Sequence, residues 1–217
     1  MNKGENIVIT VANASHMKYT QEINDTIDLA SKARGTGIAR RTDEYINKKL
    51  KEGKAIIALD GDKFVGFNYI ETWEHKKFVA NSGLIVKKEY RGLGLAKRIK
   101  QASFNLSRQL YPNSKIFGLT TGLAVMKINY ELGYRPVTFS ELTDDEAFWK
   151  GCKSCVNYDV LSRTNKTRCL CTGMLYDPAW EKEFPIHMVK KMNSNSLDKK
   201  NIILRTGRKM FSAFIHH

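Results

Sequence analysis

One short stretch, Val86–Ala96 (V-K-K-E-Y-R-G-L-G-L-A), constrains the fold more than any other part of this chain. An apolar run ends at Val86 and a helical pattern begins near Leu93, so Gly92 and Gly94 lie where a strand gives way to a helix. The first turn of a helix has backbone N–H groups without intrahelical partners, and the helix dipole adds partial positive charge there. Glycine lets such a backbone approach an anion closely. The stretch is therefore either a tight strand-to-helix turn or a phosphate-binding site.

The composition is that of a globular protein with an excess of positive charge. Of 217 residues, 42% are hydrophobic and 27% are charged, which is enough for a packed core. The 36 Lys and Arg exceed the 22 Asp and Glu, and the net charge of +14 favours polyanionic partners such as nucleic acid, anionic lipid or a phosphorylated ligand. No apolar run approaches the ~18 residues of a membrane span, and residues 1–10 lack the apolar segment of a signal peptide. We expect a cytoplasmic protein.

Hydrophobic periodicity predicts alternating strands and helices over residues 1–140. Strands are expected at 6–12, 55–59, 64–72, 78–86, 116–121 and 134–139, and helices at 15–30, 42–53, 93–110 and 123–132. This order is typical of an α+β domain with a mixed sheet, in which the helix after Gly94 crosses one face. The glycine pair would then lie near the middle of the sheet, with its ligand in the central crevice.

A loop with concentrated positive charge is predicted between the first two helices. Residues 33–41 read A-R-G-T-G-I-A-R-R and contain Arg34, Arg40 and Arg41. A guanidinium group can bind a carboxylate through two parallel hydrogen bonds. The loop is therefore either a solvated basic loop or a clamp for an anionic substrate.

A second motif, I-N-Y-E-L-G-Y at Ile128–Tyr134, follows Val86–Ala96 after one predicted helix and one predicted strand. Together the two motifs resemble those of the GCN5-related N-acetyltransferase (GNAT) superfamily, and the resemblance covers residues 7–139. It implies a GNAT-type central mixed sheet flanked by helices. It also implies an enzyme that moves an acyl group from acetyl-CoA, or another acyl-CoA, to a primary amine.

The resemblance places the donor site in two adjoining segments. Backbone N–H groups of the glycine loop would hold the pyrophosphate of coenzyme A, and the residues concerned are Arg91, Gly92, Leu93, Gly94, Leu95 and Ala96. The preceding strand would supply main-chain contacts to pantetheine and to the thioester carbonyl through Leu84, Ile85 and Val86. Three basic residues, Lys97, Arg98 and Lys100, either add positive charge nearby or belong to a solvated helix face.

The catalytic residues are less clearly marked. Many GNAT members have a tyrosine, which protonates the leaving thiolate, at the position held here by Asn129. Tyr130 is adjacent, but one step along a helix rotates a side chain by about 100°, so Tyr130 should point elsewhere. Asn129 can still bind the sulfur or the pantetheine. For the base that deprotonates the amine we expect Glu71, with Glu74 and His75 behind it, unless Glu71 is only an exposed carboxylate at a strand end.

The chain as a whole is similar to short bacterial acyltransferases of the N-acetylglutamate synthase type, which are associated with arginine biosynthesis. This similarity rests on residues 32–41 and on F-W-K-G-C-K-S-C-V-N-Y-D at 148–159. It implies glutamate or a similar amino acid as acceptor, acylated on its α-amine, with Arg34, Arg40 and Arg41 facing its carboxylates. A succinyl donor is an alternative, as is a protein or peptide amine as acceptor. A nucleic-acid-binding zinc protein is an alternative of another class, although the basic segments lack interleaved aromatic residues.

Four cysteines are clustered in C-K-S-C and C-L-C, thirteen residues apart. A reducing cytoplasm disfavours disulfides. If residues 164–167 turn a two-stranded ribbon, the two pairs meet at one end, and the ligand set of a closed structural zinc site would be Cys152, Cys155, Cys169 and Cys171. Buried free cysteines acting as small apolar residues are the alternative.

Three parts are expected along the chain: an acyl-CoA-binding catalytic domain at 1–140, a cysteine ribbon appendage at 141–180, and a basic tail at 181–217. From His187 to His217 the tail carries seven Lys and Arg and one acid, Asp198. It is either a flexible basic tail or a contact for nucleic acid or a membrane surface.

Overall fold

A computed structural model of the chain describes residues 6–34 and 41–183. Most of the expected basic tail lies outside the described residues. The chain divides into two compact units, Met1–Asp177 and Pro178–His217. Of the second unit the description covers its first six residues, which include the short helix α7 (Trp180–Glu183).

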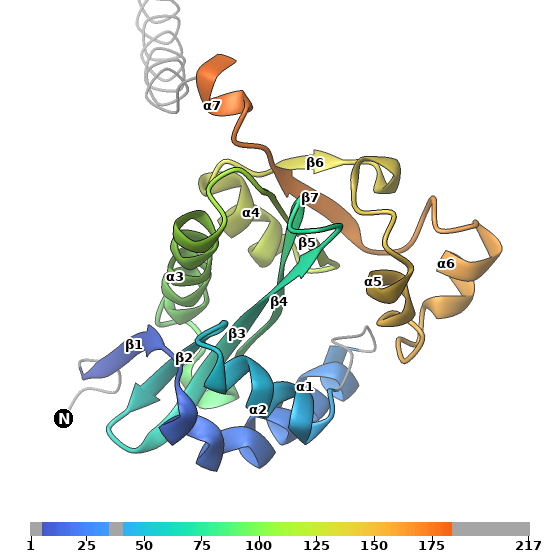
Figure 1. Ribbon diagram of the computed structural model, residues 1–217. Coiled ribbons are helices and arrows are strands. Elements are labelled where there is room, and N and C mark those ends of the chain that lie inside the picture. The colour runs from blue at the N-terminus through green and yellow to red at the C-terminus, as the bar shows by residue number, and fades with distance from the viewer. Residues whose placement is uncertain (1–5, 35–40, 184–217) are drawn as a thin grey trace, which may run out of the picture. The chain divides into compact units, whose positions relative to one another are not determined.

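A seven-stranded mixed sheet forms the centre of the first unit (Figure 1), and its order is β1-β2-β3-β4-β5-β7-β6. The strands are β1 (Ile7–Val11), β2 (Ala55–Asp60), β3 (Lys63–Trp73), β4 (Phe78–Val86), β5 (Lys115–Thr120), β6 (Arg135–Val137) and β7 (Thr172–Tyr176). Only β4 and β5 pair in parallel, and all other neighbours are antiparallel. The expected α+β class with a mixed sheet is confirmed.

Helices cover both faces of this sheet. They are α1 (Thr20–Arg34), α2 (Asp43–Lys51), α3 (Leu95–Leu110), α4 (Leu123–Glu131), α5 (Glu146–Lys150) and α6 (Tyr158–Arg163). Successive side chains of a strand point to opposite faces. Accordingly Ile56 packs in the apolar cluster that contains Ile99 of α3, whereas Ile57 packs in the one that contains Ile27 of α1 and Ile46 of α2. Figure 1 shows α3 and the pair α1–α2 on opposite sides of the strands.

The parallel pair β4–β5 separates part-way along its length. Its ladder runs from Phe78 opposite Lys115 to Ala80 opposite Phe117 and does not continue. Asn81 of β4 is the first residue beyond the ladder, where it faces Gly118 of β5. We call this point the fork. Side chains from neighbouring elements can enter the sheet here because no backbone hydrogen bonds close it.

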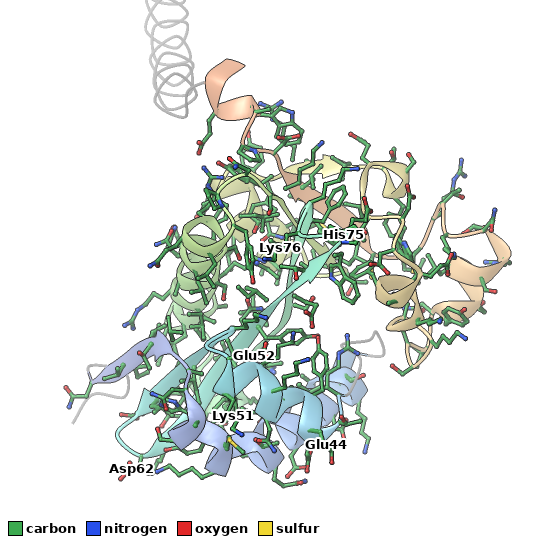
Figure 2. All side chains as sticks on the ribbon, in the orientation of Figure 1. Glu44, Lys51, Glu52, Asp62, His75 and Lys76 are labelled. Atoms are coloured by element: carbon green, nitrogen blue, oxygen red, sulfur yellow. The ribbon has the colours of Figure 1, made fainter. Side chains whose placement is uncertain are left out.

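The turn between β3 and β4 is held by side chains from elsewhere in the unit. Glu74, His75 and Lys76 all have positive φ, between 47° and 71°. Glu74 Oε1 accepts hydrogen bonds from Thr143 Oγ1 at 2.6 Å and from the Asp144 N–H at 2.7 Å. Figure 2 labels the neighbouring His75 and Lys76, which are exposed on this turn. Glu74 therefore stabilises a strained turn.

The segment after residue 140 differs from the expected ribbon. Residues between the two cysteine pairs form helix α6, because Leu161 turns inward and is 2% exposed while Asp159 and Arg163 remain outside. Strand β7, which the sequence analysis did not predict, pairs with both β5 and β6. The compact unit accordingly extends to Asp177, beyond the expected boundary at residue 140.

Candidate active site

A cavity of about 370 Å³ opens at the fork. One wall comes from β4 beyond its ladder with β5, and the facing wall comes from residues 117–120 of β5. Side chains of β3 and α2 and the segment that holds the cysteines complete the lining. A ligand in this cavity would therefore contact the centre of the sheet and residues from both ends of the first unit.

The glycine loop lies at the N-terminus of α3, as expected. Gly92 and Gly94 have φ of 84° and 71°, a backbone conformation that other residues rarely adopt. Gly94 is the N-cap of α3, and no side chain caps the helix. Residues 91–94 are exposed, while Leu95 is buried and anchors the first turn. The first-turn N–H groups thus face an open surface, which suits a phosphate.

Strand β4 contains a bulge next to the cavity. Its register with β3 shifts between Ile85, opposite Phe67, and Ser82, opposite Tyr69, so that Gly83 and Leu84 together oppose one residue. A bulge leaves a residue outside the ladder and redirects its polar groups. Leu84 lines the cavity, whereas Ile85 and Val86 are buried in the sheet. The bulge places main-chain groups of β4 where they can bind a carbonyl oxygen.

Glu71 of β3 lines the same cavity and is held by two neighbours. Its Oε2 accepts a hydrogen bond from the Tyr45 hydroxyl at 2.8 Å and forms an ion pair with Lys49. Burial, followed by the neighbouring Tyr69 and Glu71, raises the pKa of Tyr45, so this hydroxyl keeps its proton. Of the two further candidates for the base, Glu74 is engaged in the β3–β4 turn and His75 is exposed beside it, and neither lines the cavity.

Arg41 is the arginine of the basic loop that the structure brings to the cavity. Its Nε donates a hydrogen bond to the Tyr69 hydroxyl at 2.9 Å, and its guanidinium carbon lies 5.8 Å from the centre of the Tyr45 ring. Arg34 ends α1, but its side chain and the whole of Arg40 lie outside the described residues. Arg41 and Glu71 thus approach the cavity from the α2 side of the sheet.

A family model described as the acetyltransferase (GNAT) family matches residues 23–123, which include the glycine loop and the fork. Residues 23–123, just under half of the chain, therefore match a GNAT acetyltransferase domain. The expectation of an acyl-CoA-dependent N-acetyltransferase is thereby confirmed at the level of the family. A sequence search of curated proteins finds no significant match.

Solved structures with the same fold include several acetyltransferases. N-acetylglutamate synthase from Neisseria gonorrhoeae, in complex with coenzyme A and N-acetyl-glutamate, is similar with a TM-score of 0.57 and 16% identity over 81% of this chain, which spans 36% of that protein. Rv2747 from Mycobacterium tuberculosis, in complex with coenzyme A, gives a TM-score of 0.54 and 16% identity, and the match covers 78% of this chain and 98% of that protein. Diaminobutyrate acetyltransferase from Paenibacillus lautus, in complex with its substrate and coenzyme A, gives a TM-score of 0.54 and 12% identity. The match covers 81% of this chain and 96% of that protein.

Asn129 of α4, at the position of the tyrosine in many GNAT proteins, is buried against the cavity. It is 1% exposed, and within the described part of the chain its Oδ1 has no hydrogen-bond partner. Tyr130 is 61% exposed and does not line the cavity, as its helical position predicts. The GNAT domain therefore has an unpaired acceptor where a hydroxyl donor is usual.

Lys100 of α3 is the main residue that the sequence analysis misjudged. It was expected near the phosphates or on a solvated face, but it is 2% exposed and lines the cavity. A signal was available, since Ala96, Lys100, Ser103 and Ser107 follow the three-to-four spacing of a buried helix face. Three of these side chains are polar, which hides the pattern from a search for apolar residues.

All four cysteines line the cavity and are partly buried. Burial, followed by the neighbouring Cys169, Cys155 and Cys152, raises the pKa of the Cys171 thiol to about 12. The thiols are thus close neighbours. However, among the described residues no three His, Cys, Asp or Glu side chains are placed to hold a metal ion. The arrangement does not fit the expected zinc site, and no step is assigned to a metal.

Proposed function

We propose that this GNAT domain transfers an acetyl group from acetyl-CoA to the primary amine of an amino acid. The observation that carries this proposal is the placement of Arg41 and Glu71 in one cavity with the fork, so that a cation, a carboxylate and the donor site share one space. An amino acid has the complementary groups, a carboxylate for the arginine and an amine to be deprotonated. Glutamate and its close analogues are the acceptors that we favour.

The donor would lie along α3 and enter the sheet at the fork. Its pyrophosphate would bind the N–H groups of residues 91–96, where the positive φ of Gly94 keeps side-chain atoms away from the helix end. Its thioester would reach the bulge at Gly83 and Leu84, whose main-chain N–H groups can stabilise the oxyanion that forms when the amine attacks. Both segments agree with the contacts that the GNAT resemblance implies.

The acceptor would enter from the α2 side. Arg41 would bind its carboxylate through charge-assisted hydrogen bonds, and the Tyr69 hydroxyl and the Tyr45 ring hold the guanidinium in place. Glu71 would then take the proton of the amine, directly or through a water molecule. Lys49 and Tyr45 bind Oε2 and so fix the orientation of the carboxylate. Its other oxygen, Oε1, receives a long 3.4 Å contact from the Thr72 N–H.

A thiol-release assay with acetyl-CoA, run against all amino acids and 2,4-diaminobutyrate, tests the proposal. We expect turnover with glutamate or another amino acid and slower turnover with succinyl-CoA. Activity with peptide amines alone would favour a protein acetyltransferase. No turnover with any amine, together with salt-dependent retention of RNA, would overturn the proposal in favour of a nucleic-acid-binding protein.

Among the described residues, no helix is long and apolar enough to cross a bilayer. A cytoplasmic location and a place in arginine biosynthesis remain parts of the proposal. They rest on the resemblance of residues 32–41 and 148–159 to N-acetylglutamate synthase-like proteins and on the acceptor chemistry above.

A further inference from the structure

Lys100 is a buried cation with no acidic partner. It is 2% exposed, and no carboxylate in the described part of the chain pairs with it. Its Nζ lies 5.2 Å from the centre of the Tyr134 ring and 3.7 Å from the position that a Cβ atom on Gly118 would occupy. The ammonium group therefore reaches the fork, beside the point where β4 and β5 separate.

The groups around Lys100 are polar but uncharged. Asn81 accepts a hydrogen bond from the Tyr134 hydroxyl at 3.3 Å and donates one to Ser107 Oγ at 2.9 Å. The titratable groups that face this site are Tyr134 and, behind it, Tyr176, whose ring centre is 6.2 Å from that of Tyr134. Burial raises the pKa of Tyr134 well above its usual value, so this hydroxyl keeps its proton. Glu71 and the four cysteines line the same cavity, and burial is the cause of the shift in the pKa of Lys100.

An unpaired buried cation destabilises the folded chain unless a ligand or a change of protonation compensates for it. Burial lowers the pKa of Lys100 to about 7, so its charged and neutral forms are both accessible near neutral pH. On the lining of the same cavity, Asn129 Oδ1 is buried and has no hydrogen-bond partner in the described residues. Both groups line the cavity at the fork. A ligand with negative charge there would compensate the ammonium group, and a ligand with a proton to donate would satisfy the amide oxygen.

We propose that Lys100 protonates the sulfur of the departing coenzyme A, the role that a tyrosine at position 129 has in many GNAT proteins. This proposal rests on the proposed function. Lys100 belongs to α3, the helix whose N-terminus would hold the pyrophosphate, and it lies six residues after Gly94, about 9 Å along the helix axis. It thus approaches from the donor side, whereas Glu71 and Arg41 approach from the acceptor side.

The step balances as follows. The neutral amine attacks the thioester carbon, and its nitrogen gives one proton to Glu71, directly or through a water molecule. The resulting tetrahedral oxyanion re-forms its carbonyl while the C–S bond breaks. The electron pair of that bond goes to sulfur, and the Lys100 ammonium gives its proton to the sulfur. The products are the amide, coenzyme A as a thiol, protonated Glu71 and neutral Lys100. When the products leave, Glu71 releases its proton to water and Lys100 regains one.

The first test needs no acceptor. Coenzyme A is bound to the full chain, and the ionisation of its thiol is followed by thiolate absorbance against pH, with the desulfo-CoA complex subtracted to remove the signal of the four cysteines. The variant Lys100→Met keeps the length of the side chain. In it, we expect the acid constant of the coenzyme A thiol to be smaller than in the wild type by a factor of about ten or more, so that the pKa of the thiol is higher by one unit or more. Lys48→Met, an exposed lysine on α2, is the matched control and should behave as the wild type.

The outcomes separate the two proposals. If calorimetry shows that coenzyme A does not bind the wild-type chain, both the proposed function and this inference are overturned. Coenzyme A that binds, with the same thiol acid constant in the wild type and in Lys100→Met, overturns the role of Lys100 alone. Lys100→Gln provides a second variant if Lys100→Met does not fold, and the same comparison applies to it.

The second test uses the acceptor found in the thiol-release assay. We expect Lys100→Met to lower kcat roughly 100-fold, as for loss of a general acid, with little change in either KM. In the wild type, kcat should fall as the pH rises above about 7, because the ammonium is lost, and this limb should be absent in the variant. An unchanged kcat, or a wild-type limb that persists in Lys100→Met, would show that another group protonates the sulfur.

Discussion

Single residues decide how this site divides between donor and acceptor. In the proposed function, Gly94 serves the donor through its backbone conformation and Arg41 serves the acceptor through its charge. The sequence alone led to both proposals, because a glycine pair before a helix and a run of arginines are local patterns. Lys100 could not be assigned from the sequence, since a lysine is nearly always on the surface and only the packing of α3 on the sheet buries this one.

Replacing Gly94 by valine should weaken acetyl-CoA binding strongly. A β-branched residue at a φ of 71° is strained, and its side chain would project from the N-terminus of α3, where no other atom lies within 4 Å and the phosphate would bind. Titration calorimetry with acetyl-CoA measures the effect. Gly61→Val is the matched control, because Gly61 has a φ of 57° and equally open surroundings but lies in the β2–β3 turn. Equal loss of binding in both variants would argue against a phosphate site.

Replacing Arg41 by glutamine should raise the KM for the amino-acid acceptor while the KM for acetyl-CoA stays near its wild-type value. A hydrogen bond to a charged group contributes about 1.5–3 kcal/mol, which corresponds to a rise of roughly 10- to 150-fold. Steady-state kinetics with each substrate varied in turn provide the measurement. Parallel increases in both KM values would mean that Arg41 supports the cavity wall through Tyr69 instead of binding the acceptor.

At the scale of elements, the order of β1 to β5 with their helices was predictable and the end of the sheet was not. In the sheet, each of the strands β1 to β4 lies next to the strand that follows it in the chain, so local sequence patterns were sufficient. Strand β7 instead follows the cysteine segment in the sequence and lies between β5 and β6 in the sheet. Its sequence, T-G-M-L-Y, has no periodicity that indicates this position. The ribbon was wrong for a related reason, since the burial of Leu161 favours a helix between the cysteine pairs.

The cysteine segment should show thiols that react slowly at neutral pH. Burial, followed by Cys155 and Cys169, raises the pKa of Cys152 to about 11, and the pKa of Cys171 is raised to about 12. Alkylation by iodoacetamide requires the thiolate, so at pH 7 both should be modified slowly and the rate should rise about tenfold for each pH unit up to those values. Peptide mass spectrometry after timed labelling follows each cysteine.

The urea-unfolded chain provides the control for this experiment, because all four thiols should then react at the rate of free cysteine. Rapid modification of Cys152 or Cys171 in the folded chain at pH 7 would contradict the prediction. Protection that persists at high pH and is lifted by a chelator would instead mean that a metal holds the thiols, and zinc measured by plasma emission would identify it.

At the scale of the whole molecule, part of the excess charge lies apart from the site in the sequence. The residues that build the cavity all lie in the unit Met1–Asp177. By contrast, residues 184–217 carry seven Lys and Arg and a single acid, Asp198, in the sequence. A net charge of +6 out of the +14 that first suggested a polyanionic partner therefore lies in residues 184–217 and not among the residues that line the cavity.

Removal of residues 184–217 should accordingly leave acetyl transfer intact and reduce binding to polyanions. The shortened chain retains every described residue of the cavity and loses seven positive charges and one negative charge. Because the affinity for a polyanion depends on the number of basic contacts, its retention on heparin should end at a lower salt concentration than that of the full chain. The thiol-release assay on the same two proteins provides the comparison of activity. A shortened chain that keeps its heparin retention but loses turnover would place the tail in catalysis and the polyanion contact on the catalytic unit.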